Sequence, residues 1–385
     1  MQSLLAPTAN QAELSWDIFC QVVDNYGDIG VCWRLARQLA TEHQFSVRLW
    51  LDDLASLHRI CPDIDLHADV QHYASVEVRQ WSKPFPDVIP LNVVIEAFGC
   101  ELPENYLTAM TQAGRKPVWI NLEYLSAEHW VEGCHAMPSP HPRLPLTKHF
   151  FFPGFTTATG GLLREKDLLT RRDAAEQSPA SFWQWLNLTV PNKNETVVSL
   201  FCYDSTPITD LLEAWQTSSE PVRCLLPEGR VLESVASHFR QPALVPGESL
   251  QRGNLTLHVI PFLRQEDYDQ LLWACDCNFV RGEDSFVRAQ WAGKPMIWQI
   301  YVQEENAHLL KLDAFLDRYC AGLDSAAAQA LRAFHYGWNG DGSLNWNDFQ
   351  QHTAALGAHA KRWATELSAQ PDLASNLVIF CKNRV

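Results

Sequence analysis

The sequence is poor in basic residues and has no long apolar runs. Its 385 residues include 30 Lys and Arg against 45 Asp and Glu, which gives a formal net charge of −15. Proteins that hold nucleic acid by general electrostatics carry basic stripes, so this charge argues against that class. No apolar run approaches the roughly 18 residues of a membrane span. The first residues also lack the basic n-region of a signal peptide. We therefore expect no nucleic acid partner, no membrane association and a cytoplasmic location.

The C-x-x-C spacing of zinc knuckles and redox sites is absent as well, and Cys275-Asp276-Cys277 is only a C-x-C at a strand end. The cysteine count is 11, which is odd. Several lie within apolar patterns, as buried free thiols in a reducing compartment do; they are Cys20, Cys32, Cys202, Cys224 and Cys381. Cys134, His135, His141 and His149 are metal-ligand types but have no paired ligand spacing. We expect no bound metal and no cofactor.

What is present is a repeated alternation of strand-like and helix-like segments. The first half has short, nearly continuous apolar runs, typical of strands buried on both faces; they are residues 16–23, 46–51, 92–98 and 117–122. A helical pattern covers about 29–43. The second half repeats the alternation, with strands expected at 195–203, 222–228, 255–263, 277–281 and 296–301. Helices are expected at 266–274, 284–292 and 306–319.

This pattern predicts an α/β protein of two Rossmann-like, doubly wound domains. We place the first domain at residues 1–180 and the second at 190–365. The apolar tail, residues 366–385, could return to the first domain. Two such domains hold a ligand in the cleft between them, at the carboxyl ends of the strands.

One unusual loop lies at such a strand end, in "FVRGEDSFVRAQWAGKPMIW", residues 279–298. A helix that begins near Asp284 presents unpaired N–H groups and the positive end of its dipole. A pyrophosphate fits there, with help from the Ser285 hydroxyl and the charge of Arg281. Gly282 permits close approach of the backbone, and Glu283 and Asp284 could accept hydrogen bonds from sugar hydroxyls. A plain helix cap would need no ligand and is the alternative.

The spacing of this segment resembles the nucleotide-binding half of GT-B glycosyltransferases, in which a helix N-terminus replaces a metal cation. Three aromatic residues at strand ends could contact the nucleotide of such a donor; they are Phe201, Tyr203 and Phe262. Each could equally be a core aromatic residue.

The other unusual loop is "DNYGDIG", residues 24–30. It follows the first strand and would face the second loop across the cleft. Asp24 and Asp28 are candidates for acid–base work on an acceptor. Asp28 could also cap the helix at Ile29. Two acidic residues suit a cation better than a phosphate.

Four stretches together identify a family: "WDIFCQVVDNYGDIGVCWRLARQLA", "SLFCYD", "VIPFLRQEDYD" and "FVRGEDSFVRAQWAGKPMIWQIY". They resemble the bacterial protein-arginine rhamnosyltransferases that modify translation elongation factor P, the EarP family. The resemblance covers essentially the whole chain. It implies a GT-B fold, dTDP-β-L-rhamnose as donor, and inverting transfer to an arginine of elongation factor P.

The resemblance also implies a role for each site residue. Asp24 matches the proposed general base, Asp28 the second acid of its loop, and Glu283 a further catalytic carboxylate. Tyr203, Arg281, Asp284 and Ser285 match donor contacts, Phe201 and Phe262 match the thymine pocket, and Tyr26 and Gly27 lie where the backbone meets the donor.

Three alternatives remain at this stage. A nucleotide-sugar epimerase could use the same two-domain frame. A non-catalytic two-domain binding protein would have a similar cleft but would not need Asp24. A dinucleotide-dependent dehydrogenase is disfavoured because "DNYGDIG" lacks the G-x-G-x-x-G spacing. Whether Asp24 or Glu283 takes the proton also stays open.

Overall fold

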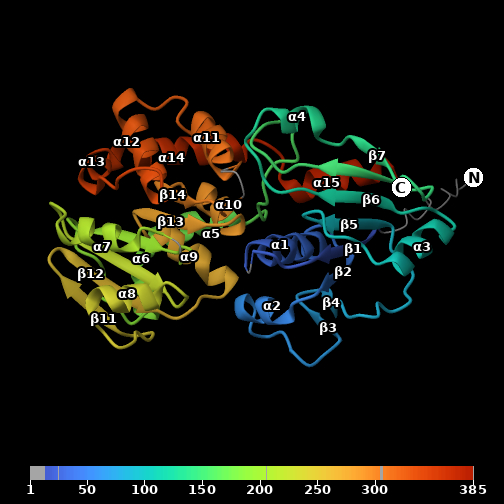
Figure 1. The fold of residues 1–385 in the computed structure, drawn as a ribbon, viewed down its shortest axis with the longest axis horizontal. Coiled ribbons are helices and arrows are strands. Elements are labelled where there is room, and N and C mark those ends of the chain that lie inside the picture. Colours follow the sequence, from blue (N-terminus) through green and yellow to red (C-terminus); the bar gives the residue numbers. More distant parts are fainter. Residues whose placement is uncertain (1–13, 25, 205, 304–306, 385) are drawn as a thin grey trace, which may run out of the picture.

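The computed structural model describes residues 14–24, 26–204, 206–303 and 307–384. Within these ranges the chain forms two α/β domains, each built on one mainly parallel sheet. In Figure 1 the first domain, coloured blue to green, lies on the right, and the second, yellow to orange, lies on the left. The predicted α/β class is confirmed.

The first sheet has the order β3-β4-β2-β1-β5-β6-β8-β7. Its strands are β1 (Ser15–Cys20), β2 (Ser46–Leu51), β3 (Val70–Tyr73), β4 (Val76–Gln80), β5 (Val93–Ala97), β6 (Val118–Leu122), β7 (Pro138–Pro140) and β8 (Thr147–Phe151). The four predicted strands are the central ones, β1, β2, β5 and β6, and they pair in parallel. The unpredicted β3–β4 and β7–β8 pairs are antiparallel and form the two edges.

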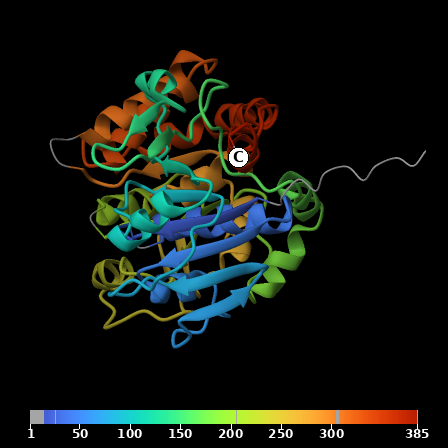
Figure 2. The same ribbon diagram turned by 90° about the vertical axis from the view of Figure 1, so that its right-hand side faces the viewer.

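Helices pack on both faces of this sheet (Figure 2). α1 (Gly27–Thr41) and α2 (Leu54–Ile60) pack on one face and α3 (Glu104–Gln112) on the other, while the short helix α4 (Trp130–Cys134) lies apart from both faces (Figure 1). Ile18, Leu49, Ile95 and Ile120, one from each central strand, are fully buried. Such continuous burial is why these strands show as unbroken apolar runs in the sequence.

The second sheet has the order β11-β12-β10-β9-β13-β14, with only β11 antiparallel to its neighbour. Its strands are β9 (Thr196–Leu200), β10 (Val222–Pro227), β11 (Ser249–Arg252), β12 (Leu255–Ile260), β13 (Cys277–Arg281) and β14 (Met296–Gln299). All but the edge strand β11 were predicted, and several end two or three residues earlier than expected.

The second domain is rich in helices. They are α7 (Ile208–Gln216), α8 (Leu232–Phe239), α9 (Gln265–Ala274), α10 (Asp284–Ala292), α11 (Ala307–Tyr319), α12 (Ser325–Trp338), α13 (Trp346–Gln351) and α14 (Thr353–Ser368). The predicted helices at 266–274, 284–292 and 306–319 correspond to α9, α10 and α11; residue 306 lies outside the described residues.

Two segments cross between the domains. The first holds α5 (Leu168–Gln177) and α6 (Pro179–Trp185), and Phe182 and Trp183 of α6 pack in a cluster with Val197 and Leu271 of the second domain. The second crossing leads from α14 back to α15 (Leu373–Lys382), which lies beside the first sheet in Figure 1. There the ring of Phe380 lies 5.6 Å from that of Phe151 in β8.

All 11 cysteines are free thiols, and all except Cys134 are buried, which confirms the free thiols predicted from the sequence. Among the described residues we find no helix with the length and apolarity needed to span a membrane.

Candidate active site

The loop that follows β1 is held in place by its own acidic residue. Oδ2 of Asp28 accepts hydrogen bonds from the backbone N–H groups of Val23 (2.8 Å) and Asp24 (2.9 Å). The prediction that Asp28 caps the helix at Ile29 is wrong, because α1 already begins at Gly27 and its N-cap is Tyr26 without a side-chain cap. Asp28 instead lies inside the first turn and ties the loop that carries Asp24 to the helix. Asn25 lies outside the described residues.

The loop that follows β13 meets Asp24 from the other domain. Gly282 has a positive φ of 59°, and a Cβ added there would lie 2.5 Å from Oδ2 of Asp24. A Cβ at Gly27 would lie 2.6 Å from the same oxygen. Both glycines therefore leave room for the Asp24 carboxylate, which lies where the two domains touch.

A phenol from a third loop completes this contact. The hydroxyl of Tyr203, just beyond β9, donates a hydrogen bond of 2.7 Å to Oδ2 of Asp24. Burial raises the pKa of Asp24, while the hydrogen bond from Tyr203 and the charge of Arg281 act in the opposite direction. The carboxylate is thus held between a donor group and a cation in a partly dry site.

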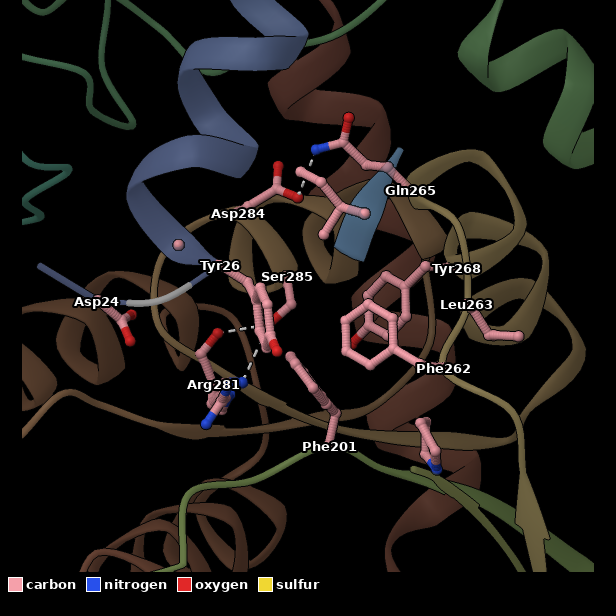
Figure 3. Close-up of a pocket in the computed structure, with 13 residues that line it drawn as sticks. Asp24, Tyr26, Phe201, Phe262, Leu263, Gln265, Tyr268, Arg281, Asp284 and Ser285 are labelled. Carbon is pink, nitrogen blue, oxygen red and sulfur yellow. Dashed lines mark hydrogen bonds between the residues drawn. The ribbon is translucent and has the colours of Figure 1, made fainter. Parts of the chain in front are cut away.

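Aromatic rings and one guanidinium form a pocket on one side of Asp24. The Arg281 guanidinium lies 4.6 Å from the ring centre of Phe201, 4.5 Å from that of Tyr203 and 5.8 Å from that of Tyr26. The Tyr26 and Phe262 rings are 5.0 Å apart. Figure 3 shows Phe201, Phe262 and Tyr268 gathered on one side of this aromatic pocket, with Asp24 at the other side. Such walls suit a flat base, and the cation suits a phosphate.

The start of α10 borders the same pocket. Asp284 and Ser285 line it, and the first turn of the helix presents backbone N–H groups there. The Ser285 hydroxyl accepts a hydrogen bond from the Arg281 N–H (3.0 Å) and donates one to the Arg281 carbonyl. It therefore braces the loop that carries Arg281, in addition to facing the pocket.

Asp284 connects the two domains. Its Oδ1 accepts a hydrogen bond of 2.9 Å from Nε of Arg34 in α1, and its Oδ2 accepts one of 3.1 Å from Gln265. A Cβ added at Gly30 of α1 would lie 2.9 Å from the Asp284 Cβ. Both carboxylate oxygens are engaged with protein groups, so Asp284 holds α10 against α1 at the edge of the pocket.

Sequence reasoning missed the buried ion network behind this contact. Arg34 also bonds to Asp269 and Glu165, and Arg288 pairs with the same two acids. Arg34 is only 3% exposed and Arg288 1%. Charged residues on helices normally indicate a solvent-exposed face, so the sequence contains no signal for this network.

A second, acidic cavity lies on the other side of Asp24. Residues from both domains line it, among them Asp24, Asp28, Tyr124, Glu283 and Lys311. Oε1 of Glu283 accepts a hydrogen bond from the Leu125 N–H, and Oε2 is buried with no hydrogen-bond partner in the described part of the chain. Burial raises the pKa of Glu283 to about 8, and burial also raises the pKa of Asp28.

The structure brings all the predicted site residues into one region. Those that line the aromatic pocket are Asp24, Tyr26, Gly27, Phe201, Phe262, Arg281, Asp284 and Ser285. Those that line the acidic cavity are Asp24, Asp28, Gly282 and Glu283. Tyr203 contacts both Asp24 and Arg281. Asp24 is the predicted residue common to the two cavities. Sequence reasoning did not identify Tyr124, Lys311, Gln265 or Tyr268, which line them too.

The metal-ligand types around Cys134 do not form a metal site in the described part of the chain. Among residues 14–24, 26–204, 206–303 and 307–384, no three His, Cys, Asp or Glu side chains are placed to hold a metal ion. In the segment with Cys134, Nδ1 of His135 accepts a hydrogen bond from Phe152 N–H and Nδ1 of His141 accepts from Leu144 N–H.

Comparison with known proteins identifies the fold. The chain resembles the solved structure reported as "Structural basis for EarP-mediated arginine glycosylation of translation elongation factor EF-P", with 37% identity, a TM-score of 0.70, and coverage of 97% of this chain and 100% of that one. The structure of the spinosyn rhamnosyltransferase SpnG with thymidine diphosphate is 10% identical, with a TM-score of 0.51 over 95% of this chain and 99% of that one. The fold is GT-B, as the sequence predicted.

Sequence comparison identifies the family. A protein-arginine rhamnosyltransferase of Pseudomonas putida is 50% identical over 375 residues, which cover 96% of this chain and 99% of the relative. The family described as "Elongation-Factor P (EF-P) rhamnosyltransferase EarP" matches residues 16–382. These matches favour a transferase over the epimerase alternative. The chain therefore belongs to the EarP family of elongation factor P rhamnosyltransferases.

Proposed function

We propose that this protein transfers L-rhamnose from dTDP-β-L-rhamnose to an arginine side chain of translation elongation factor P, with inversion at the sugar carbon and without a metal ion. The observation that carries the proposal is the position of Asp24. Its carboxylate lies between an aromatic, cationic pocket suited to a nucleotide and an acidic cavity suited to a guanidinium. A group between donor and acceptor can act on both.

The aromatic pocket is the proposed donor site. Phe201 and Phe262 would enclose the thymine, and Arg281 with the N-terminus of α10 would face the diphosphate. Arg281 already lies near several ring faces, where its charge is partly desolvated and therefore attracts an anion more strongly. The same positive groups take the place of a metal cation in neutralising the leaving diphosphate.

The acidic cavity is the proposed acceptor site. Asp24, Asp28 and Glu283 line it, so a buried guanidinium would find carboxyl oxygens there in place of the water that it leaves, and its charge would favour their ionised forms. A guanidinium has a pKa above ~12 and is a poor nucleophile while fully protonated. Carboxylates that accept its N–H protons lower this barrier.

The transfer is a single nucleophilic displacement at the anomeric carbon of the rhamnose. A guanidinium nitrogen attacks the anomeric carbon from the face opposite the diphosphate and forms the C–N bond. The C–O bond to the diphosphate breaks, and its electron pair leaves with dTDP. The proton of the attacking nitrogen passes to a carboxylate, either Asp24 or Glu283. The β-linked donor thus becomes an α-linked rhamnosyl arginine.

Modified elongation factor P would then be active in rescuing ribosomes that stall at polyproline stretches. The acceptor is a translation factor, so the reaction would take place in the cytoplasm.

Intact-mass analysis of elongation factor P tests the proposal. After incubation with this protein and dTDP-β-L-rhamnose, the factor should gain the mass of one deoxyhexose. The matched acceptor in which the target arginine is lysine should gain almost none, because carboxylates arranged around a planar fork do not hold a compact ammonium in the same attack geometry. No gain on the wild-type factor contradicts the proposal, and turnover of the donor sugar without any acceptor would favour an epimerase.

A further inference from the structure

Tyr124 lines the acidic cavity but has no part in the displacement described above. It follows β6 by two residues and lines the cavity with Asp24, Asp28 and Glu283. Its hydroxyl acts to lower the pKa of Asp28, against the larger rise that burial causes. The ring itself therefore stands beside the carboxylates that would hold the acceptor.

A second aromatic ring, that of Phe98, packs against the Tyr124 ring. Phe98 stacks on Tyr124 with ring centres 4.5 Å apart and an interplanar angle of 21°. Phe98 takes a left-handed backbone conformation, with φ of 57°, at the carboxyl end of β5. A non-glycine residue rarely adopts this conformation, and such strain is concentrated at functional sites. The bend after β5 places an aromatic support directly against Tyr124.

The structure already contains a cation near this ring. The Lys311 ammonium lies 6.0 Å from the centre of the Tyr124 ring, at the limit of a cation–π contact, and its charge favours the ionised form of Glu283. The Tyr124 ring and the nearby acids thus already attract a positive charge before any acceptor arrives.

From this geometry we propose that Tyr124 determines acceptor specificity by stacking its ring on the flat face of the acceptor guanidinium. The carboxylates of Asp24, Asp28 and Glu283 accept hydrogen bonds from the N–H groups at the edge of that guanidinium. This inference rests on the proposed function and adds the means by which the site distinguishes arginine from lysine. A guanidinium stacks well on an aromatic face, whereas an ammonium is a compact, strongly hydrated point charge. The carboxylates alone would attract both side chains and distinguish them only in the geometry of attack, whereas the ring adds a preference for arginine in binding.

Small probes test the inference without elongation factor P. The protein saturated with dTDP is titrated with N-acetyl-arginine amide and with N-acetyl-lysine amide, and binding is followed by calorimetry or NMR. The wild type should prefer the arginine probe by about 3- to 30-fold, the range expected for cation–π and stacking contacts. Tyr124→Leu should reduce this ratio to about one to two. Tyr124→Phe keeps the ring, loses the hydroxyl near Asp28, and should keep the preference.

Kinetics with elongation factor P supply the second measurement. Tyr124→Leu should raise the acceptor KM about 3- to 30-fold, with dTDP affinity within about twofold of wild type, since Tyr124 does not line the aromatic pocket. If the leucine variant fails to bind dTDP or to melt cooperatively, Tyr124→Met replaces it. A preference for arginine that survives loss of the ring, or that falls equally in the phenylalanine variant, overturns the inference.

The two proposals fail separately. An arginine preference that depends on the Tyr124 ring, in a protein that leaves elongation factor P unmodified, would contradict the proposed function and support the inference about Tyr124. Transfer to the factor, together with an unchanged arginine preference in Tyr124→Leu, would support the proposed function and contradict the inference about Tyr124.

Discussion

Replacing Glu283 with glutamine removes a carboxyl group that the fold keeps protonated at neutral pH. Glu283 has a pKa of about 8, which burial raises from 4.5, and its Oε2 has no hydrogen-bond partner in the described residues. Glutamine has nearly the same shape and does not ionise. The variant should therefore keep the fold and lose the pH dependence that this carboxyl group imposes.

The direction of the pH dependence of stability follows from the raised pKa of Glu283 in the folded state. Below pH 4.5 both the folded and the unfolded states hold the proton, so the carboxyl group causes no loss of stability. Between 4.5 and 8 the unfolded chain releases its proton while the folded protein retains it, so stability falls as pH rises. From pH 6 to pH 8 the wild type should lose about 2 kcal/mol of unfolding free energy through this residue, and the glutamine variant should not.

Urea unfolding of both proteins at pH 6 and pH 8, followed by tryptophan fluorescence, measures this difference. The stability of Glu283→Gln relative to wild type should increase by about 2 kcal/mol between the two pH values. Glu101→Gln is a suitable control, because Glu101 is an exposed glutamate that does not line the cavity. Parallel pH profiles for wild type and Glu283→Gln would refute the assignment of a raised pKa to Glu283.

Acceptor binding gives the matching functional measurement. A guanidinium in the acidic cavity favours the ionised form of Glu283, so binding should release a proton below pH 8. The acceptor KM of the wild type should fall up to about tenfold per pH unit as pH rises toward 8. Glu283→Gln should show little pH dependence and a rate lower by roughly 10²–10⁴. Calorimetry in two buffers of different ionisation enthalpy measures the released proton; its absence in wild type would contradict the reasoning.

Three further predictions concern the neighbouring groups. Asp24→Asn should lower transfer by on the order of 10²–10⁴ while dTDP binding, measured by calorimetry, stays nearly intact, because the amide oxygen can still accept from Tyr203; a large loss of dTDP affinity would mean that nucleotide binding itself needs the charge of Asp24. Transfer should continue in excess EDTA, since Arg281 and the α10 N-terminus supply the positive charge; loss of activity that magnesium restores would contradict this. Arg34→Met should lower stability by about 3 kcal/mol and weaken dTDP binding, since it leaves the Asp284 Oδ1 without its cation; an unchanged melting temperature would show that the network does not stabilise the domain contact.

The sequence by itself determined the central strands and the two functional loops. Strands such as β5 and β9 are buried on both faces and show as continuous apolar runs. Each unusual loop follows such a strand and precedes a helix, so both were predicted at the carboxyl ends of sheets, facing one cleft. The residue types then indicated the chemistry, with acids for a cation and a helix N-terminus with Arg281 for a phosphate.

The edge elements could not be predicted in the same way. β3, β7 and β11 pair on one side only and expose alternate or most residues. They have neither a continuous apolar run nor enough length for a clear alternation. The start of α1 at Gly27, ahead of the acidic residue expected to cap it, likewise depends on the loop contacts of Asp28.

Only the tertiary structure decided how the site works, because its decisive contacts join residues far apart in the chain. Arg34 and Asp284 are 250 positions apart, and Tyr203 and Asp24 are 179 apart. The burial that raises the pKa of Glu283 comes from the packing of one domain on the other. In the sequence Tyr124 is one aromatic residue among many, and only the fold places Phe98 and the acids beside it. Local patterns encode strands, helices and loops, whereas the dielectric environment of a carboxylate and its partners depends on how those elements pack.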